Sequence, residues 1–306
     1  MTNSLRKKGI LLAVSGATLW GINGTFADVV FSRLAAPVEW VVGTRLLVAG
    51  LIILLYAKFK LKNPVGAIWQ QPKDFWALIA FSLIGMVSCQ YLFFLSIGAN
   101  GAGLATILQF TSPIIIYMYL VMRREKTVFM QEILYILLVF LGVFLIVTKG
   151  QLGQVAVNLN GLVIGLGSAL GVAFYTLQPR RLLAEYGSPI VVGWGMLLGG
   201  GLFQLIHPIW QPGFSLDWQA ILYMAFIIVI GTALAFSLFL ASLTYIEASL
   251  SNILAAFEPL VANILTALLL NQQWTPVQIL GILLVIVFVV LFANYGEKKK
   301  RIVLGE

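Results

Sequence analysis

The chain has 306 residues, of which 60% are hydrophobic and only 10% are charged, with a net charge of +8 and a mean hydropathy of +0.99. Soluble domains carry about 25% charged residues, so these charges are too few to cover a water-exposed surface. The composition therefore argues against a soluble protein and predicts an integral membrane protein whose apolar surface faces lipid.

The first apolar run covers residues 9–31 and follows Arg6, Lys7 and Lys8. A cleaved signal peptide has an apolar core of about 7–15 residues and a small-residue cleavage site. The run in this chain is longer than that and is long enough to cross a bilayer. We therefore expect it to be retained as the first transmembrane helix.

Ten segments approach the length of about 20 mostly apolar residues that a spanning helix needs. They are approximately 9–31, 38–57, 75–97, 101–122, 130–148, 160–178, 190–207, 218–240, 248–270 and 276–294. The connections between them are short and contain turn-forming pairs such as Asn100-Gly101 and Thr275-Pro276. The sequence therefore predicts an all-α integral membrane fold with ten transmembrane helices.

The positive residues alternate between the two sides of these spans. With the N-terminus inside, the inner segments hold 16 of the 19 Lys and Arg residues. These are Arg6, Lys7, Lys8, Lys58, Lys60, Lys62, Lys73, Arg123, Arg124, Lys126, Arg180, Arg181, Lys298, Lys299, Lys300 and Arg301. The positive-inside rule then predicts a multi-pass protein of the cell membrane with both termini cytoplasmic. It also accounts for the net charge, so no nucleic-acid partner is expected.

The two halves of the chain resemble each other. Residues 102–108 match residues 248–254, Pro113 falls opposite Pro259, and a second match follows at residues 133–139 and 279–285. Each half, 1–150 and 151–306, contains five spans, and an odd number forces the second half into the membrane upside down. Inverted repeats place a site near the midplane and favour transport by alternating access. A duplication without alternating access is the alternative.

Four short motifs follow the order found in a known family. They are Leu19-Trp20-Gly21-Ile22-Asn23-Gly24, Thr44-Arg45-Leu46, the segment 113–125 and Glu258-Pro259. With the layout of five plus five spans, the whole chain resembles EamA-type transporters of the drug/metabolite transporter superfamily. The resemblance implies a ten-helix secondary carrier for small metabolites, often an exporter of amino acids or related amphiphiles.

Glu258 is the sharpest polar signal within a span. It lies ten residues into the ninth span, which is about 15 Å and close to the bilayer midplane. A carboxyl there must be protonated, paired or facing water. Pro259 removes the helical bond to the carbonyl of Ala255, and a broken helix is tolerated where it lines a cavity. Glu258 is therefore either a substrate contact and proton-coupling acid, or a carboxyl bonded to the freed backbone.

Pro113 makes the corresponding break in the fourth span. Thr106, Gln109 and Pro113 share one helical face, and the counterpart of Thr106 in the ninth span is Asn252. We expect both faces to point inward, with Thr106, Gln109 and Asn252 binding substrate. Plain helix packing is the alternative.

Further substrate-binding candidates lie in the first, third and sixth spans. Trp20 and Asn23 lie near mid-depth, where an inward-facing tryptophan can stack on a cation or an aromatic ring; ordinary core packing is the alternative. The third span also offers Gln90 and Tyr91 as candidates, and the sixth span offers Tyr175.

Asp28 and Arg45 both fall in the outer half of the membrane. We expect a structural ion pair between them rather than a substrate anchor, although Arg45 can also snorkel outward.

The remaining function classes find little support. One cysteine, Cys89, and one histidine, His207, make neither a disulfide nor a usual zinc site. No catalytic residue, metal or cofactor is expected, and no filter-like charged ring indicates a channel.

The sequence predicts a secondary carrier of a small metabolite such as an amino acid or amine, working by export, with proton or sodium as coupling ion. A drug-efflux carrier and, less favoured, a membrane-embedded enzyme are the alternatives, and both monomer and homodimer remain open.

Overall fold

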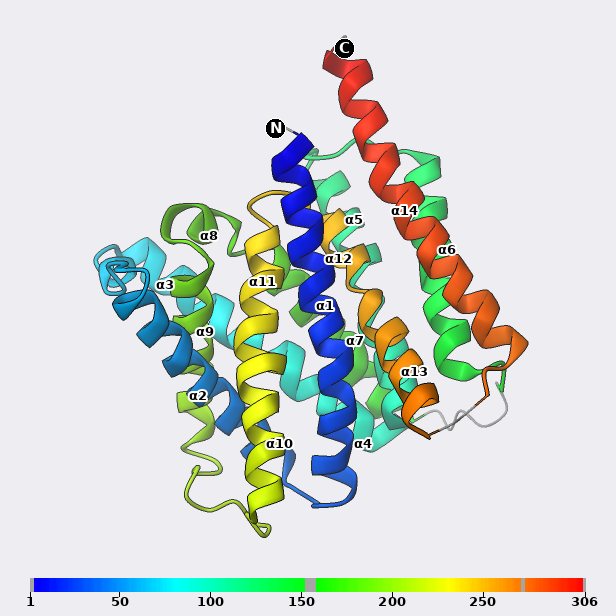
Figure 1. The fold of residues 1–306 in the computed structure, drawn as a ribbon. Helices are drawn as coiled ribbons and strands as arrows, with labels where there is room; N and C mark the ends of the chain where they lie inside the picture. Colours follow the sequence, from blue (N-terminus) through cyan, green and yellow to red (C-terminus); the bar gives the residue numbers. More distant parts are fainter. Residues whose placement is uncertain (1–2, 152–157, 271–272, 305–306) are drawn as a thin grey trace.

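The computed structural model describes residues 3–151, 158–270 and 273–304, and over these ranges it contains helices and no strand (Figure 1). The elements are α1 (Asn3–Ser32), α2 (Val38–Phe59), η1 (Ala67–Trp69), α3 (Pro72–Ala80), η2 (Phe81–Val87), α4 (Ser88–Gln109), α5 (Ser112–Met122), α6 (Met130–Thr148), α7 (Leu159–Leu177), α8 (Arg180–Tyr186), α9 (Ser188–Phe203), α10 (Trp218–Ile228), η4 (Val229–Leu234), α11 (Ala235–Ser242), α12 (Ala248–Leu254), α13 (Phe257–Leu270) and α14 (Pro276–Leu304).

The all-α membrane fold is confirmed. Within the described residues, nine helical segments are long and apolar enough to cross a membrane, and the remaining expected span is the 16-residue helix α9. The sequence predicted that this span continues to residue 207, but α9 ends at Phe203. The Gln204 amide donates to the carbonyls of Gly201 and Leu202, and its side chain accepts from the Ile209 amide. These bonds stabilise a non-helical turn, so the helix does not continue beyond Phe203.

The two halves are interlocked rather than placed side by side. α2 packs along α9, α4 along α7, α6 along α14, and α1 lies against α11 and α13. Each of these contacts joins a helix of the first half to one of the second. α6 and α14 form a pair at one edge of the bundle, and both chain ends lie on the same side of it (Figure 1).

The fourth and ninth spans are both interrupted, and at nearly equivalent positions. The chain turns at residues 110–111 between α4 and α5, and at residues 255–256 between α12 and α13. Pro113 and Pro259 lie just after these turns, in the first turn of the following helix. A proline is favourable there because that position needs no amide hydrogen bond. The expected breaks are therefore present, and each proline begins the second half-helix of its span.

The carbonyl that Pro259 leaves without its helical partner is bonded nearby. The Ala255 oxygen accepts from the backbone amide of Glu258 at 2.9 Å. The bond comes from the main chain, so the Glu258 carboxyl is not needed to satisfy this carbonyl. This weighs against the purely structural interpretation of the carboxyl.

A second symmetric feature was not predicted from the sequence. The third span of each half contains a π-helical segment, which is η2 in the first half and η4 in the second. Such segments are rare and occur often at functional sites. In η4, a Cβ on Gly231 would lie 2.1 Å from Asn23 Oδ1, and in η2 a Cβ on Gly85 would lie 2.9 Å from Tyr175 Cβ. The backbone of η4 therefore packs closely against Asn23, and the backbone of η2 packs closely against Tyr175. Both are predicted site residues.

The short helix α8 was also not predicted. Hydrogen bonds connect it to Asp74 at the start of α3. The Asp74 carboxylate accepts one hydrogen bond from Tyr186 Oη at 2.5 Å and another from the Arg181 guanidinium. The hydrogen bond to Asp74 is the main cause that raises the pKa of Tyr186 to about 12. This cluster links the two halves at the bundle end that carries the chain termini.

Candidate functional site

A cavity of about 640 Å³ lies between the two halves. Its deep wall includes Trp20 and Glu258, near the middles of the first and ninth spans. Its lining extends to Arg33 and Lys149, which directly follow the ends of α1 and α6. The cavity therefore reaches from mid-depth to the bundle end opposite the chain termini (Figure 1).

Most of the predicted substrate-binding residues meet at this cavity. Those that line it are Trp20, Asn23, Gln90, Thr106, Gln109, Tyr175 and Glu258, and Pro259 lines it as well. They come from α1, α4, α7 and α13, which are far apart in the sequence. The fold thus gathers these side chains around one space, and their binding of substrate stays a prediction.

Tyr91 and Asn252 are not among the lining residues. Tyr91 Oη donates to Glu39 at 3.0 Å. Asn252 is 1% exposed and accepts from Ser112 Oγ at 2.9 Å. The expectation for Asn252 assumed one continuous helix through Pro259. The turn at residues 255–256 interrupts that periodicity, so the face of α12 does not continue along α13.

Arg45 occupies the cavity wall and is 6% exposed. Its guanidinium donates to Gln90 Oε1 and lies 5.1 Å from the centre of the Phe94 ring. The side chain of Asp28, its expected partner, lies outside the described part of the structure. Within the described part of the chain, an amide and an aromatic ring contact the Arg45 guanidinium, and both the ion pair with Asp28 and the substrate-anchor role stay predictions.

Glu258 and Arg45 both line the cavity. Glu258 lies in the first turn of α13, where the partial positive charge of a helix N-terminus favours a carboxylate. The cavity thus presents one acidic and one basic side chain.

An aromatic wall supports the deep end of the cavity. The Trp20 ring lies 4.7 Å from Phe236 and 4.8 Å from Phe239, and Tyr175 lies 6.1 Å from Phe236. Trp20 therefore both packs in the core and lines the cavity, so its two interpretations are compatible.

Gln109 is partly used by the protein itself. Its amide donates to Ser168 Oγ at 2.6 Å and to the Cys89 carbonyl at 3.2 Å. The first bond joins α4 to α7, the second lies within α4, and together they orient the amide at the cavity wall.

Sequence reasoning missed Asn263, Phe94 and Phe236. Asn263 lies one turn beyond Pro259 on α13, so continuing the helical spacing past the proline identifies it. The two phenylalanines carry no sequence signal that separates them from the other apolar residues of their spans.

Four buried polar atoms at the wall have no hydrogen-bond partner among the described residues. They are Trp20 Nε1, Asn23 Oδ1, Arg45 Nε and Asn263 Oδ1. A buried polar group left unsatisfied costs about 1–3 kcal/mol. A cluster of them around one cavity marks a place where a bound polar molecule or a conformational change adds hydrogen bonds. In the described part of the chain, no group of three His, Cys, Asp or Glu residues forms a metal site.

Comparison with known proteins agrees with this architecture. The model of the EamA-like transporter family matches residues 7–148 and 159–294. The chain is 33% identical to the uncharacterized inner membrane transporter YicL of Salmonella typhimurium, covering 96% of this chain and 98% of that protein. It is 29% identical to the threonine/homoserine exporter RhtA of Escherichia coli, covering 92% and 91%.

One crystal structure of another protein superposes with a TM-score of 0.79 at 14% identity, covering 95% of this chain and 99% of that one. At this identity the likeness shows the fold alone. The family model, in contrast, matches both halves and most of the chain. This chain therefore belongs to the EamA-like transporter family and is a membrane transporter.

Proposed function

We propose that this protein is a secondary carrier of the inner membrane that exports a small zwitterionic metabolite, such as an amino acid, by alternating access. The observation that carries the proposal is the pair of opposite charges, Arg45 and Glu258, on the wall of one central cavity. A carboxylate of the substrate pairs with Arg45, and its ammonium group pairs with Glu258. The name of the relative RhtA, a threonine/homoserine exporter, supports this class.

The size and polarity of the cavity agree with such a substrate. Its volume of about 640 Å³ falls in the usual range of small-molecule sites, roughly 300–1,000 Å³. The acceptors Asn23 Oδ1 and Asn263 Oδ1 complement an ammonium group, and the donors Trp20 Nε1 and Arg45 Nε complement a carboxylate. A zwitterion offers both kinds of group at once.

Alternating access is supported by the inverted architecture. As far as the described residues line it, the cavity reaches the bundle end opposite the chain termini. Two inverted halves can exchange their conformations to open the other end. With the dividing point near residue 150, the halves are 1–150 and 151–306. The positive-inside rule places both termini in the cytoplasm, so this conformation is open to the outside.

Glu258 is the proposed coupling acid. A proton and a substrate ammonium group compete for the same carboxylate, and such competition couples their movement in opposite directions. Sodium is the alternative coupling ion. The aromatic wall around Trp20 and Tyr175 favours, as a second candidate, a carrier that exports aromatic or cationic toxic compounds.

A transport screen in proteoliposomes tests the substrate class. Amino acids, the matching amines and the matching carboxylic acids are compared under pH and sodium gradients. Saturable transport of zwitterions, with little transport of either singly charged analogue, is the expected result. Transport of amines and drugs alone would favour the second candidate.

Arg45 gives a sharper test of the carboxylate contact. Arg45→Gln is expected to weaken binding of the zwitterion about 10- to 100-fold, because a hydrogen bond to a charged group contributes about 1.5–3 kcal/mol. Arg45→Lys keeps the charge and should lose less. Arg33→Gln, at the far end of the lining, is the matched control and should bind normally. Calorimetric binding measures all three, and unchanged affinity in Arg45→Gln contradicts the proposed contact.

A further inference from the structure

The bundle end that carries the chain termini is closed beneath the cavity. Its innermost contact is the hydrogen bond of 2.9 Å from Ser112 Oγ to Asn252 Oδ1, which joins the first residue of α5 to the second half of α12. Both side chains are buried. The bond crosses from the first half of the chain to the second, so it holds the halves together directly below the cavity.

An apolar layer follows toward the same end. Ile116 and Leu120 of α5 pack with Ala173 of α7 and Ala248 of α12, in a buried cluster separate from the main core. All four side chains are at most 5% exposed. The layer again joins the first half to the second.

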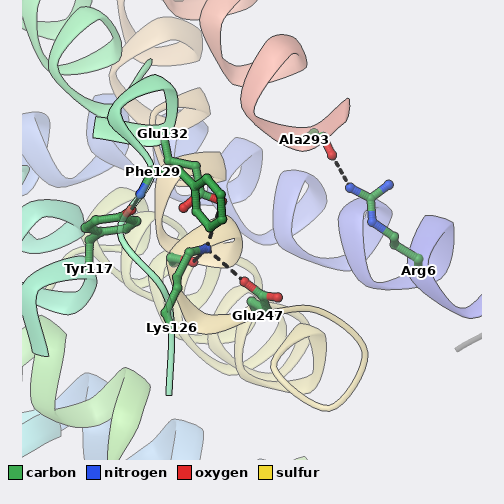
Figure 2. A network of polar contacts seen from close by, with 8 residues as sticks. Arg6, Tyr117, Lys126, Phe129, Glu132, Glu247 and Ala293 are labelled. Atoms are coloured by element: carbon green, nitrogen blue, oxygen red, sulfur yellow. Dashed lines mark hydrogen bonds and ion pairs between the residues drawn. The ribbon is translucent and has the colours of Figure 1, made fainter. Parts of the chain in front are cut away.

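A charged network centred on Lys126 follows α5 at this end of the bundle (Figure 2). Lys126 Nζ lies 3.3 Å from Glu132 Oε1 and 3.0 Å from Glu247 Oε2, and it donates to Ser249 Oγ at 3.4 Å. It also lies 5.6 Å from the ring centre of Phe292. Lys126, Glu132 and Tyr117, whose ring centre lies 5.5 Å from Lys126 Nζ, belong to the first half. Glu247, Ser249 and Phe292 belong to the second.

The two acidic partners differ in burial, and the difference suits a contact that opens and closes. The side chain of Glu132 is 3% exposed, whereas that of Glu247 is 54% exposed. An exposed ion pair is weak and can break at little cost. When it breaks, Glu132 stays beside Lys126 within the same half, so no buried charge is left uncompensated.

The inverted repeat does not duplicate these three charges in the sequence. The 146-residue offset between the halves places Gln272 opposite Lys126, Gln278 opposite Glu132 and Gly101 opposite Glu247. All three counterparts are uncharged. The helix breaks and the π-helical segments are repeated in both halves, whereas the ion-pair residues are not.

From this asymmetry we propose that Lys126, bridging Glu132 and Glu247, is the charged latch of an inner gate whose deeper layers are the apolar cluster and the Ser112–Asn252 bond. The latch favours the conformation in which the cavity is open at the opposite end. Its Lys126–Glu247 arm separates when the carrier opens toward the termini. The inference rests on the proposed alternating access.

The test compares two ion pairs of equal length. Glu247→Gln removes the arm that crosses between the halves. Glu185→Gln removes the 3.0 Å pair with Arg181 within the single helix α8, where no gate function is expected. Each is combined with a reporter cysteine after Cys89→Ala: Ser251→Cys in the closed path, or Val147→Cys in the cavity lining. A membrane-impermeant maleimide is applied to either side of oriented vesicles.

Glu247→Gln is expected to label Ser251→Cys about two- to five-fold faster from the side of the termini, as loss of a weak exposed pair shifts a two-state population by that factor. In the same variant, labelling of Val147→Cys from the opposite side should become slower. Glu185→Gln should change neither rate. The double variant Lys126→Gln, Glu132→Gln should reproduce the shift without leaving a buried charge unpaired.

The outcomes separate the gate from the transport mechanism. Slow labelling of Ser251→Cys in the chain with an intact gate supports alternating access. If Glu247→Gln leaves that labelling rate unchanged, only the latch is contradicted. Faster labelling of Ser251→Cys without slower labelling of Val147→Cys indicates local loosening and also contradicts the latch. If Ser251→Cys reacts in no variant, both proposals are contradicted.

Discussion

Replacing Glu258 with glutamine is expected to abolish transport driven by a pH gradient. Among the described residues, Glu258 is the only acidic side chain that lines the cavity. Glutamine keeps the size of the side chain but can neither release nor bind a proton at neutral pH. We expect ΔpH-driven accumulation in proteoliposomes to fall more than about 10-fold, in line with the usual contribution of a positioned proton-transfer group.

Glu258→Asp is the matched control because it keeps a carboxyl in the first turn of α13. It should retain a pH-dependent rate, with a loss caused only by the shorter reach. Substrate binding to Glu258→Gln should no longer depend on pH, since proton and ammonium no longer compete for one group. Full ΔpH-driven transport by Glu258→Gln would show that another group couples the proton.

The largest expected effect on folding is at Gly200, where α9 meets α2. A Cβ at this position would lie 2.2 Å from the backbone nitrogen of Leu47, and the helices would have to move apart. Small residues allow such close approach of membrane helices. Overpacking costs about 1–3 kcal/mol, so Gly200→Ala should lower the thermal midpoint in detergent by roughly 3–10 °C. Gly200→Leu should prevent accumulation of folded protein.

Gly201 provides an adjacent control. A Cβ there meets no atom within 4 Å, so Gly201→Ala should leave the thermal midpoint unchanged or raise it slightly through its better helix propensity. Equal destabilisation by Gly200→Ala and Gly201→Ala would mean that helix α9 itself, and not its contact with α2, limits stability.

The helical spans were predictable because lipid imposes a simple rule on the chain. A segment that crosses the bilayer must be apolar and must satisfy its own backbone hydrogen bonds, so hydropathy alone locates it. The seventh span was the exception: α9 ends at Phe203, because Gln204 forms local bonds that hydropathy does not register.

Helical periodicity identified cavity residues where one helix stayed continuous. Trp20 and Asn23 on α1, and Thr106 and Gln109 on α4, share faces that helical periodicity identifies, and all four line the cavity. Asn252 does not line the cavity, and a turn separates its helix α12 from α13. A proline indicates such a break, but not how the face rotates across it.

Composition, charge and the internal repeat thus determined by themselves a multi-span all-α membrane protein with inverted halves, because these properties depend on the solvent and on the order of segments along the chain. Only the tertiary structure brought Arg45 and Glu258 to one cavity, located the π-helical segments and joined Lys126 to Glu247. Contacts of this kind join residues far apart in the sequence, and their geometry depends on how the helices pack together rather than on any local pattern.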